Sequence, residues 1–184
     1  MREKRRTMNL QTLEALAREI GFEDCGACAA GELHVRSDVR DMCALGRCGM
    51  FGRNWSCPPA CGELEEYAAS IAVKSTCLVV QTVRAMEDEF DIETMQEAEA
   101  VQKERVFALA DKLREEGADV LILASGACTL CPKCTYPDEP CRFPEKRLVS
   151  MESAGLMVNE VCQQAQVPYN HGRMTITYTG AVIF

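Results

Sequence analysis

Cys77-Leu-Val-Val-Gln-Thr-Val83 and Asp119-Val-Leu-Ile-Leu-Ala124 are two short apolar runs, and each is typical of a buried β-strand. The stretch between them, from Ile92 to Glu116, repeats apolar residues at helical spacing and is followed by Gly117, a common helix terminator. The order strand, helix, strand is the βαβ pattern, which predicts that the two strands form a parallel pair.

Shorter elements are predicted on both sides of this unit. Apolar residues at helical spacing over residues 10–20 predict a helix that is capped by Asn9 and ended by Gly21. The other predicted elements are helices around residues 64–71 and 158–165 and an alternating strand with one more polar face over residues 174–179.

The chain has 184 residues, the size of one domain. We therefore predict a single α/β (or α+β) domain over residues 1–184, with a mixed sheet flanked by helices and two cysteine-rich metal-binding loops. Its predicted parts are the first cysteine-rich loop at 22–61, the helix-strand-helix-strand core at 62–125, the second cysteine-rich loop at 126–144, and a helix with the terminal strand at 145–184.

Charge and hydropathy exclude several classes of protein. A net charge of −8 argues against a nucleic-acid partner, because a protein that binds nucleic acid normally has a basic face. The longest apolar run has five residues, Val120 to Ala124, whereas a membrane-spanning helix needs about 20. The first six residues, Met1 to Arg6, are rich in Lys and Arg, but no apolar region follows them. We therefore do not expect a secretory signal there. We therefore predict a cytoplasmic protein with no membrane partner.

Cysteine is the compositional outlier, with 12 residues. A cytoplasmic chain keeps its thiols reduced, so many cysteines at short spacings indicate metal ligands rather than disulfides. This count is the main indication of function.

The spacing Cys128-x2-Cys131-x2-Cys134-x6-Cys141 is the strongest motif. Ferredoxins use three cysteines at successive x2 spacing to hold three irons of a [4Fe–4S] cluster. Structural zinc sites favour two separated Cys-x2–4-Cys pairs, because a tetrahedral site has no use for three consecutive x2 ligands. An iron–sulfur cluster is the favoured interpretation, with zinc and unligated thiols as alternatives.

A second set, Cys43-x4-Cys48-x8-Cys57-x3-Cys61, predicts another four-thiolate site. The spacing is looser, but Cys57 precedes two prolines, as the last cysteine of a ferredoxin motif precedes one. Residues 40–61 hold three arginines and one aspartate, and this local positive charge favours an anionic cluster. The alternative is that the arginines are simply solvated.

The remaining cysteines are less specific. Cys25-x2-Cys28 is open to two interpretations, an additional ligand pair or a redox dithiol. We predict that Cys77 and Cys162, which lie on apolar elements, are small buried residues. The single tryptophan, Trp55, is expected to anchor the core rather than to shield a cluster.

Together these motifs resemble one known family, domain of unknown function 2284, described as predicted metal-binding proteins. The first signature is Arg40-x2-Cys43-x4-Cys48 with Asn54-Trp-Ser-Cys57-Pro-Pro-Ala-Cys61-Gly, and the second is Gly126-Ala-Cys128-Thr-Leu-Cys131-Pro-Lys-Cys134-Thr-Tyr-Pro with Pro140-Cys141-Arg-Phe-Pro144. Two later blocks, Ser150-Met-Glu-Ser-Ala-Gly155 and Thr175-Ile-Thr-Tyr-Thr-Gly180, are also similar. The resemblance covers residues 20–184 and implies metal binding through these cysteines as iron–sulfur clusters.

The sequence therefore predicts a metal-binding protein that carries one or two [4Fe–4S] clusters and transfers electrons to a partner enzyme. Two other hypotheses stay open. One is a zinc-binding interaction module whose loops are pinned by metal, and the other is an iron–sulfur enzyme with one cluster iron open to substrate. Four cysteine ligands at both sites favour electron transfer, whereas an open iron needs a site with three.

Overall fold

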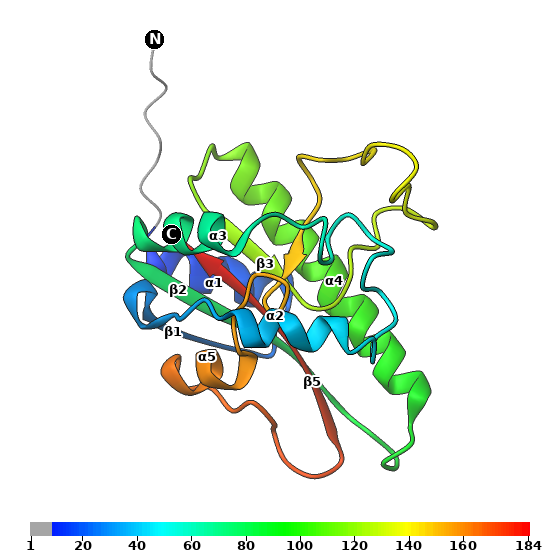
Figure 1. Ribbon diagram of the computed structural model, residues 1–184. Helices are drawn as coiled ribbons and strands as arrows, with labels where there is room; N and C mark the ends of the chain where they lie inside the picture. The colour runs from blue at the N-terminus through cyan, green and yellow to red at the C-terminus, as the bar shows by residue number, and fades with distance from the viewer. Residues whose placement is uncertain (1–8) are drawn as a thin grey trace.

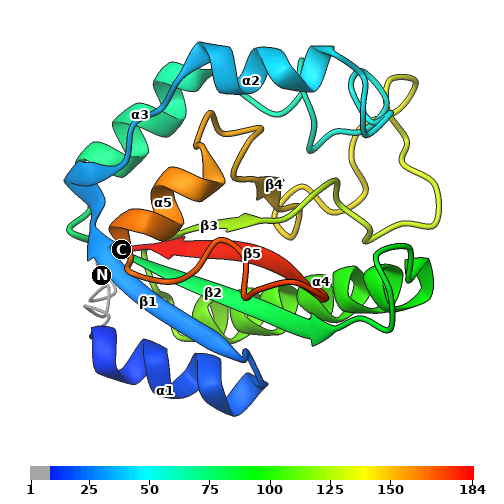
Figure 2. The same cartoon turned by 90° about the horizontal axis from the view of Figure 1, so that it is seen from below.

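The computed structural model describes residues 9–184, and in them one five-stranded mixed sheet carries helices on both faces (Figures 1 and 2). The strands are β1 Asp24–Ala29, β2 Thr76–Ala85, β3 Leu121–Ala124, β4 Val149–Ser150 and β5 Thr175–Ile183. The helices are α1 Leu10–Ile20, the 3-10 turn η1 Ala30–Glu32, α2 Ser37–Ala44, α3 Leu64–Ala72, α4 Ile92–Glu115 and α5 Val158–Gln164. This architecture confirms the predicted single α+β domain. The basic residues at positions 1–6 lie outside the described residues.

The predicted pairing of β2 with β3 is wrong. The sheet order is β1-β2-β5-β3-β4, so β5 lies between the two strands and is antiparallel to both. Ile183 of β5 is opposite Cys77 on one side and Leu121 on the other. β2 and β3 still run in the same direction, as a helical crossover dictates. The pattern of one βαβ unit does not show whether a later strand inserts between its two strands.

Two apolar cores lie on opposite faces of the sheet, because successive side chains of a strand point to opposite sides. Leu78 and Val80 of β2 pack on the face covered by α1 and α4. Cys77 and Val79 pack on the other face, against α5 and one end of α3. Figure 2 shows these three layers. No helix of residues 9–184, α4 included, is long and apolar enough to cross a membrane.

Residues 22–61 are more regular than the predicted loop. They contain the edge strand β1 and the helix α2, and only the part after α2 is irregular. Gly26 in the middle of β1 disguises this strand in the sequence, because glycine is disfavoured in strands. A Cβ atom at this position would lie 2.3 Å from the carbonyl oxygen of Ala165. The absent side chain therefore lets the end of α5 approach β1.

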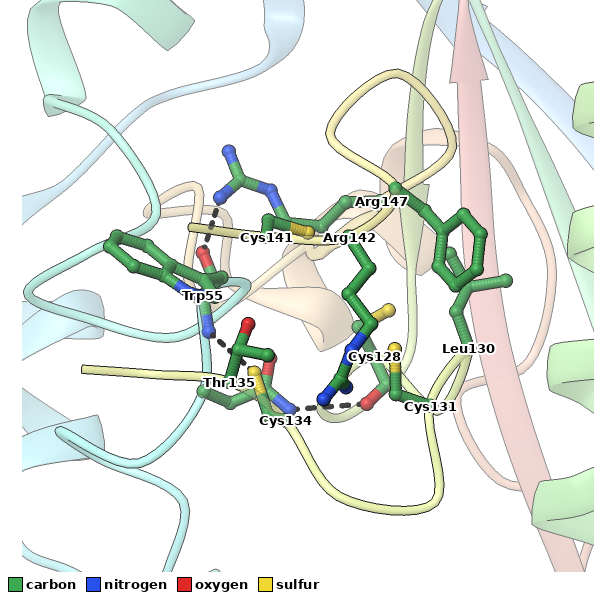
Figure 3. A pocket seen from close by; sticks show the side chains of 11 residues that line it. Trp55, Cys128, Leu130, Cys131, Cys134, Thr135, Cys141, Arg142 and Arg147 are labelled. Carbon is green, nitrogen blue, oxygen red and sulfur yellow. Dashed lines mark hydrogen bonds between the residues drawn. The ribbon is translucent and has the colours of Figure 1, made fainter. Parts of the chain in front are cut away.

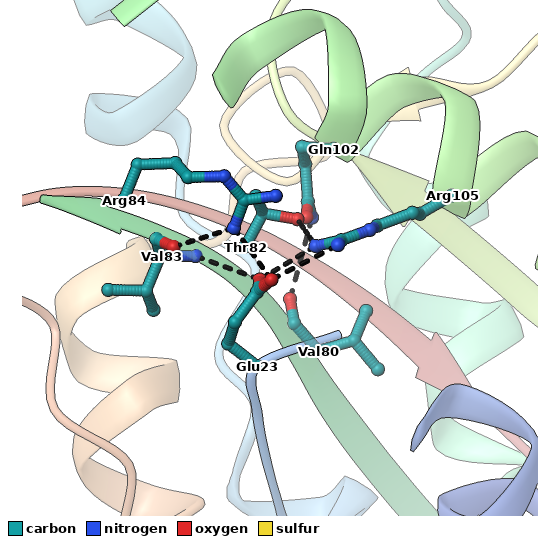
Figure 4. Close-up of polar contacts among 7 residues, drawn as sticks. All are labelled: Glu23, Val80, Thr82, Val83, Arg84, Gln102 and Arg105. Atoms are coloured by element: carbon teal, nitrogen blue, oxygen red, sulfur yellow. Dashed lines mark hydrogen bonds and ion pairs between the residues drawn. The ribbon is translucent and has the colours of Figure 1, made fainter. Parts of the chain in front are cut away.

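Glu23, just before β1, ties this edge strand to its neighbours (Figure 4). Its carboxylate accepts hydrogen bonds from Arg84 of β2 at 2.6 Å and from Arg105 of α4 at 2.6 and 3.0 Å. Partial burial by itself raises the pKa of Glu23, but these hydrogen bonds and one from the Val83 N–H outweigh it and lower the pKa overall. The carboxylate is therefore held in its charged form.

Candidate metal centre

The four cysteines of the first loop, here called the first quartet, lie around the end of α2 and the turns that precede α3. Cys43 is in the last turn of α2, Cys57 and Cys61 are buried, and Cys48 is exposed. Gly46, Gly49 and Gly52 adopt positive φ angles of 71°, 69° and 64°, a backbone shape that other residues rarely accept. These turns fold the chain back so that the thiol of Cys57 lies near enough to Cys43, Cys48 and Cys61 for their charges to act on it.

The pKa shifts of Cys57 and Cys43 reflect the other thiols nearby. Burial is the largest cause that raises the pKa of Cys57, to about 11, and the neighbouring thiols Cys48, Cys61 and Cys43 add to it. Burial likewise raises the pKa of Cys43, with further contributions from Glu152 and two of the same thiols. Four thiols gathered in a half-buried place cannot all ionise without a compensating cation, and bound metal is one such cation.

The second quartet, Cys128, Cys131, Cys134 and Cys141, lines one cavity beside β3 (Figure 3). Arg142 and Arg147 line the same cavity and bring positive charge to it. Burial is the main cause that raises the pKa of Cys128, with contributions from Cys141 and Cys131. All four cysteines of the second quartet therefore face one cavity, and their role as ligands stays a prediction.

A short segment, Asn54-Trp55-Ser56, joins the two quartets. The Cys128 N–H donates to Ser56 Oγ at 2.8 Å, and Asn54 Nδ2 donates to the Cys128 carbonyl oxygen at 3.1 Å. Ser56 also lies next to Cys57, with 3.8 Å between Oγ and Sγ. Both Asn54 and Ser56 are buried. A segment of the first loop therefore forms one wall of the second site.

Trp55 lies at this junction and not in either core, so the prediction that it anchors the core is wrong. Its backbone N–H donates to Cys134 Sγ at 3.5 Å, and its indole N–H donates to the Glu139 carbonyl oxygen at 3.0 Å. The ring packs edge-on against Tyr136, with 4.9 Å between the centroids. Trp55 therefore covers one side of the second quartet (Figure 3). In the sequence, Trp55 stands two residues before Cys57, and this position was the signal that it lies near a cysteine site.

The other cysteines lie apart from the quartets. Cys25 and Cys28 belong to β1, but they contact opposite cores of the sheet, so they do not form a ligand pair. Cys28 is directly opposite Cys77 across the β1–β2 ladder, and Cys77 and Cys162 are fully buried. Burial at these positions agrees with the prediction for Cys77 and Cys162.

The side chains of both quartets fit a metal ion or cluster that thiolate ligands hold. All eight candidate ligands are sulfur atoms, which suit zinc and iron–sulfur clusters. Beside the first quartet, Arg40 Nη2 is buried and has no hydrogen-bond partner among the described residues, as expected if an anionic group belongs there. No three Cys, His, Asp or Glu side chains of residues 9–184 already have the spacing of a single-ion site. Metal binding therefore involves rotation of the thiol side chains or movement of the loops.

Comparison with known proteins identifies the family. The family described as "Predicted metal-binding protein (DUF2284)" matches residues 27–184. The chain belongs to this family. Both quartets lie inside the matched region, whereas Cys25 lies just before it.

Two other comparisons add little to this family assignment. No curated protein matches the sequence of this family member. Among solved structures, epoxyqueuosine reductase from Bacillus subtilis is similar with a TM-score of 0.43 and 10% sequence identity. The similarity covers 94% of this chain but 44% of that one, so the chain spans less than half the length of the reductase.

Proposed function

We propose that this protein binds one iron–sulfur cluster at each quartet, in the [4Fe–4S] form, and that it passes electrons to a partner protein. The observation that carries the proposal is that the two loops with four candidate ligands each, one after α2 and one after β3, lie side by side at one end of the molecule (Figures 1 and 2). Four thiolate ligands leave no iron open to substrate, and this favours electron transfer over catalysis at the cluster.

Three features of the second site support a cluster in particular. The x2 spacing of Cys128, Cys131 and Cys134 is that of a cluster-binding run. The Trp55 N–H already points at Cys134 Sγ, and hydrogen bonds from backbone N–H groups to cluster sulfur atoms raise the reduction potential. Arg142 and Arg147 favour the negative charge of a thiolate-ligated cluster.

A structural zinc centre is the second candidate, and one observation favours it. The cavity that the second quartet helps to line is small, with a volume of about 20 Å³, and this suits a single ion better than a four-iron cluster. A four-iron cluster requires the loop of residues 126–144 to move outward. In the zinc case the metal and the Asn54–Ser56 segment pin the two loops together.

Anaerobic purification followed by metal and sulfide analysis separates these candidates. We expect a brown protein that contains iron and acid-labile sulfide and that bleaches on reduction. Colourless protein with stoichiometric zinc, and no iron after anaerobic reconstitution, contradicts the proposal. The variant Cys131→Ser, which loses one ligand of the second quartet, is expected to lose iron, and Cys25→Ser is the matched control.

A further inference from the structure

Arg40 of α2 is held in one orientation by three contacts. Its Nε donates to the Ser153 carbonyl oxygen at 2.8 Å, and its Nη1 donates to the Gly62 carbonyl oxygen at 2.8 Å. The guanidinium carbon lies 5.7 Å from the centroid of the Tyr67 ring. Both acceptors are neutral peptide oxygens, so these bonds orient the guanidinium without neutralising its charge.

The third nitrogen of this guanidinium is the unusual one. Nη2 is buried, and among residues 9–184 no group accepts a hydrogen bond from it. A buried N–H of a cation that lacks both water and an acceptor is strongly unfavourable. Its orientation therefore makes sense if an acceptor from outside the protein chain completes the site.

Cys61 of the first quartet lies close to this guanidinium. Cys61 Sγ is 3.8 Å from the Ser153 carbonyl oxygen, the same atom to which Arg40 Nε donates. Cys61 is 2% exposed, so little water screens it from the guanidinium.

We infer that Arg40 is the charge-compensating and positioning residue of the first quartet, and that its Nη2–H donates to the anionic thiolate–metal group formed there. This inference rests on the proposed metal site but not on the identity of the metal. Loss of the positive charge then weakens metal binding by the first quartet. In an iron–sulfur centre it also disfavours the reduced form, which carries one more negative charge.

A cobalt titration tests the inference without iron. The full-length chain carries both Cys131→Ser and Cys134→Ser, which leave two thiols in the second quartet, so that the thiolate charge-transfer absorption of tightly bound Co²⁺ reports on the first quartet. We expect Arg40→Gln to weaken Co²⁺ binding about tenfold or more, the usual effect of losing a hydrogen bond to a charged group. Arg40→Lys keeps the positive charge but loses the planar guanidinium with its several N–H donors, and it should weaken Co²⁺ binding less. Arg53→Gln, an exposed arginine of the same loop, is the matched control and should bind as the parent does.

The midpoint potential of the reconstituted first centre separates an electrostatic role from a merely structural one. We expect a negative shift of about 59 mV in Arg40→Gln, a tenfold change for one electron, and recovery of most of the shift in Arg40→Lys. Cobalt affinity of Arg40→Gln and Arg40→Lys equal to that of Arg53→Gln would overturn the inference. If Arg40→Gln does not fold, unchanged cobalt affinity in Arg40→Lys alone overturns it. Iron-free wild-type protein whose cobalt binding depends on Arg40 contradicts the cluster proposal and supports the inference.

Discussion

At the scale of single residues, the surroundings of a thiol decide what it can do. Cys77 and Cys162 are fully buried in the same core, and neither belongs to a cysteine quartet. Gln81 Nε2 also donates to Cys162 Sγ, at 3.6 Å. These contacts fill space in a core and leave no room for a metal ion.

We therefore expect Cys77→Ala and Cys162→Ala to change stability but not metal content. Each substitution leaves a small cavity, which lowers the free energy of unfolding by about 1–2 kcal/mol. Denaturant unfolding measures the loss, and metal analysis of the same samples checks the ligand assignment. A variant that loses metal would have to be counted among the ligands.

Glu23→Gln tests the ionic link between β1, β2 and α4. Because Glu23 is about one-third exposed, we expect a loss of only about 1 kcal/mol at pH 7. The folded pKa of Glu23 lies below its ordinary value of 4.5. Its contribution is therefore complete above that value and fades as the pH falls through the folded pKa. Unfolding curves of wild type and variant should converge in acid, and a constant difference down to pH 2 would argue against the ionic link.

At the scale of elements, packing divides the two cysteine-rich regions. β1, η1 and α2 each contribute a buried residue, Cys28, Ala30 and Val39 respectively. The turns after α2 and the loop after β3 contain many exposed side chains, among them Arg47, Arg53 and Lys133. These parts have little apolar surface to hold them, so metal–thiolate bonds should supply most of their ordering free energy.

Chelation should therefore expose residues 45–61 and 126–144 to trypsin before the rest of the chain. We expect new cleavages near Arg47, Arg53, Lys133 and Arg142, while α4 stays intact because its inner face is buried. Mass spectrometry of timed digests of metal-loaded and chelated protein gives the positions. Identical digests would indicate that packing alone holds both loops.

Periodicity predicted the regular elements well and the irregular ones poorly. α4 and β2 were evident because their apolar residues repeat over many positions. β1 was missed because its sequence, Asp-Cys-Gly-Ala-Cys-Ala, has small side chains whose burial depends on α5. The insertion of β5 between β2 and β3 was not predictable from local pattern, since it depends on pairing across about 100 residues of sequence.

The candidate ligands were all indicated by their spacing, and their surroundings were not. Ser56 and Asn54 gave no signal as side chains that contact the second loop 72 and 74 residues away. The sequence showed Arg40 as local charge and as part of the first family signature, but the unpartnered Nη2 of its guanidinium is visible only in three dimensions. Sequence spacing predicts candidate ligands, whereas the groups around them come from distant segments.

At the scale of the whole molecule, the two quartets are neighbours that share hydrogen bonds but no thiol. We expect Cys134→Ser, in the second quartet, to lower the iron content to about half of the wild-type value. Cys48→Ser, in the first quartet, should lower it by a similar amount. Each quartet has its own four sulfur atoms, so one site should survive the loss of the other. Iron and sulfide per chain are the measurements. Complete loss of iron in either variant would indicate a single shared centre.

The central place of β5 has a consequence for biosynthesis. β5 follows both cysteine-rich loops along the chain, yet it pairs with β2 and β3 and closes the gap between them. A ribosome therefore releases all eight candidate ligands before the strand that completes the sheet is made. Non-local pairing of this kind slows folding, so the nascent loops have time to meet cellular metal donors while the sheet is still open.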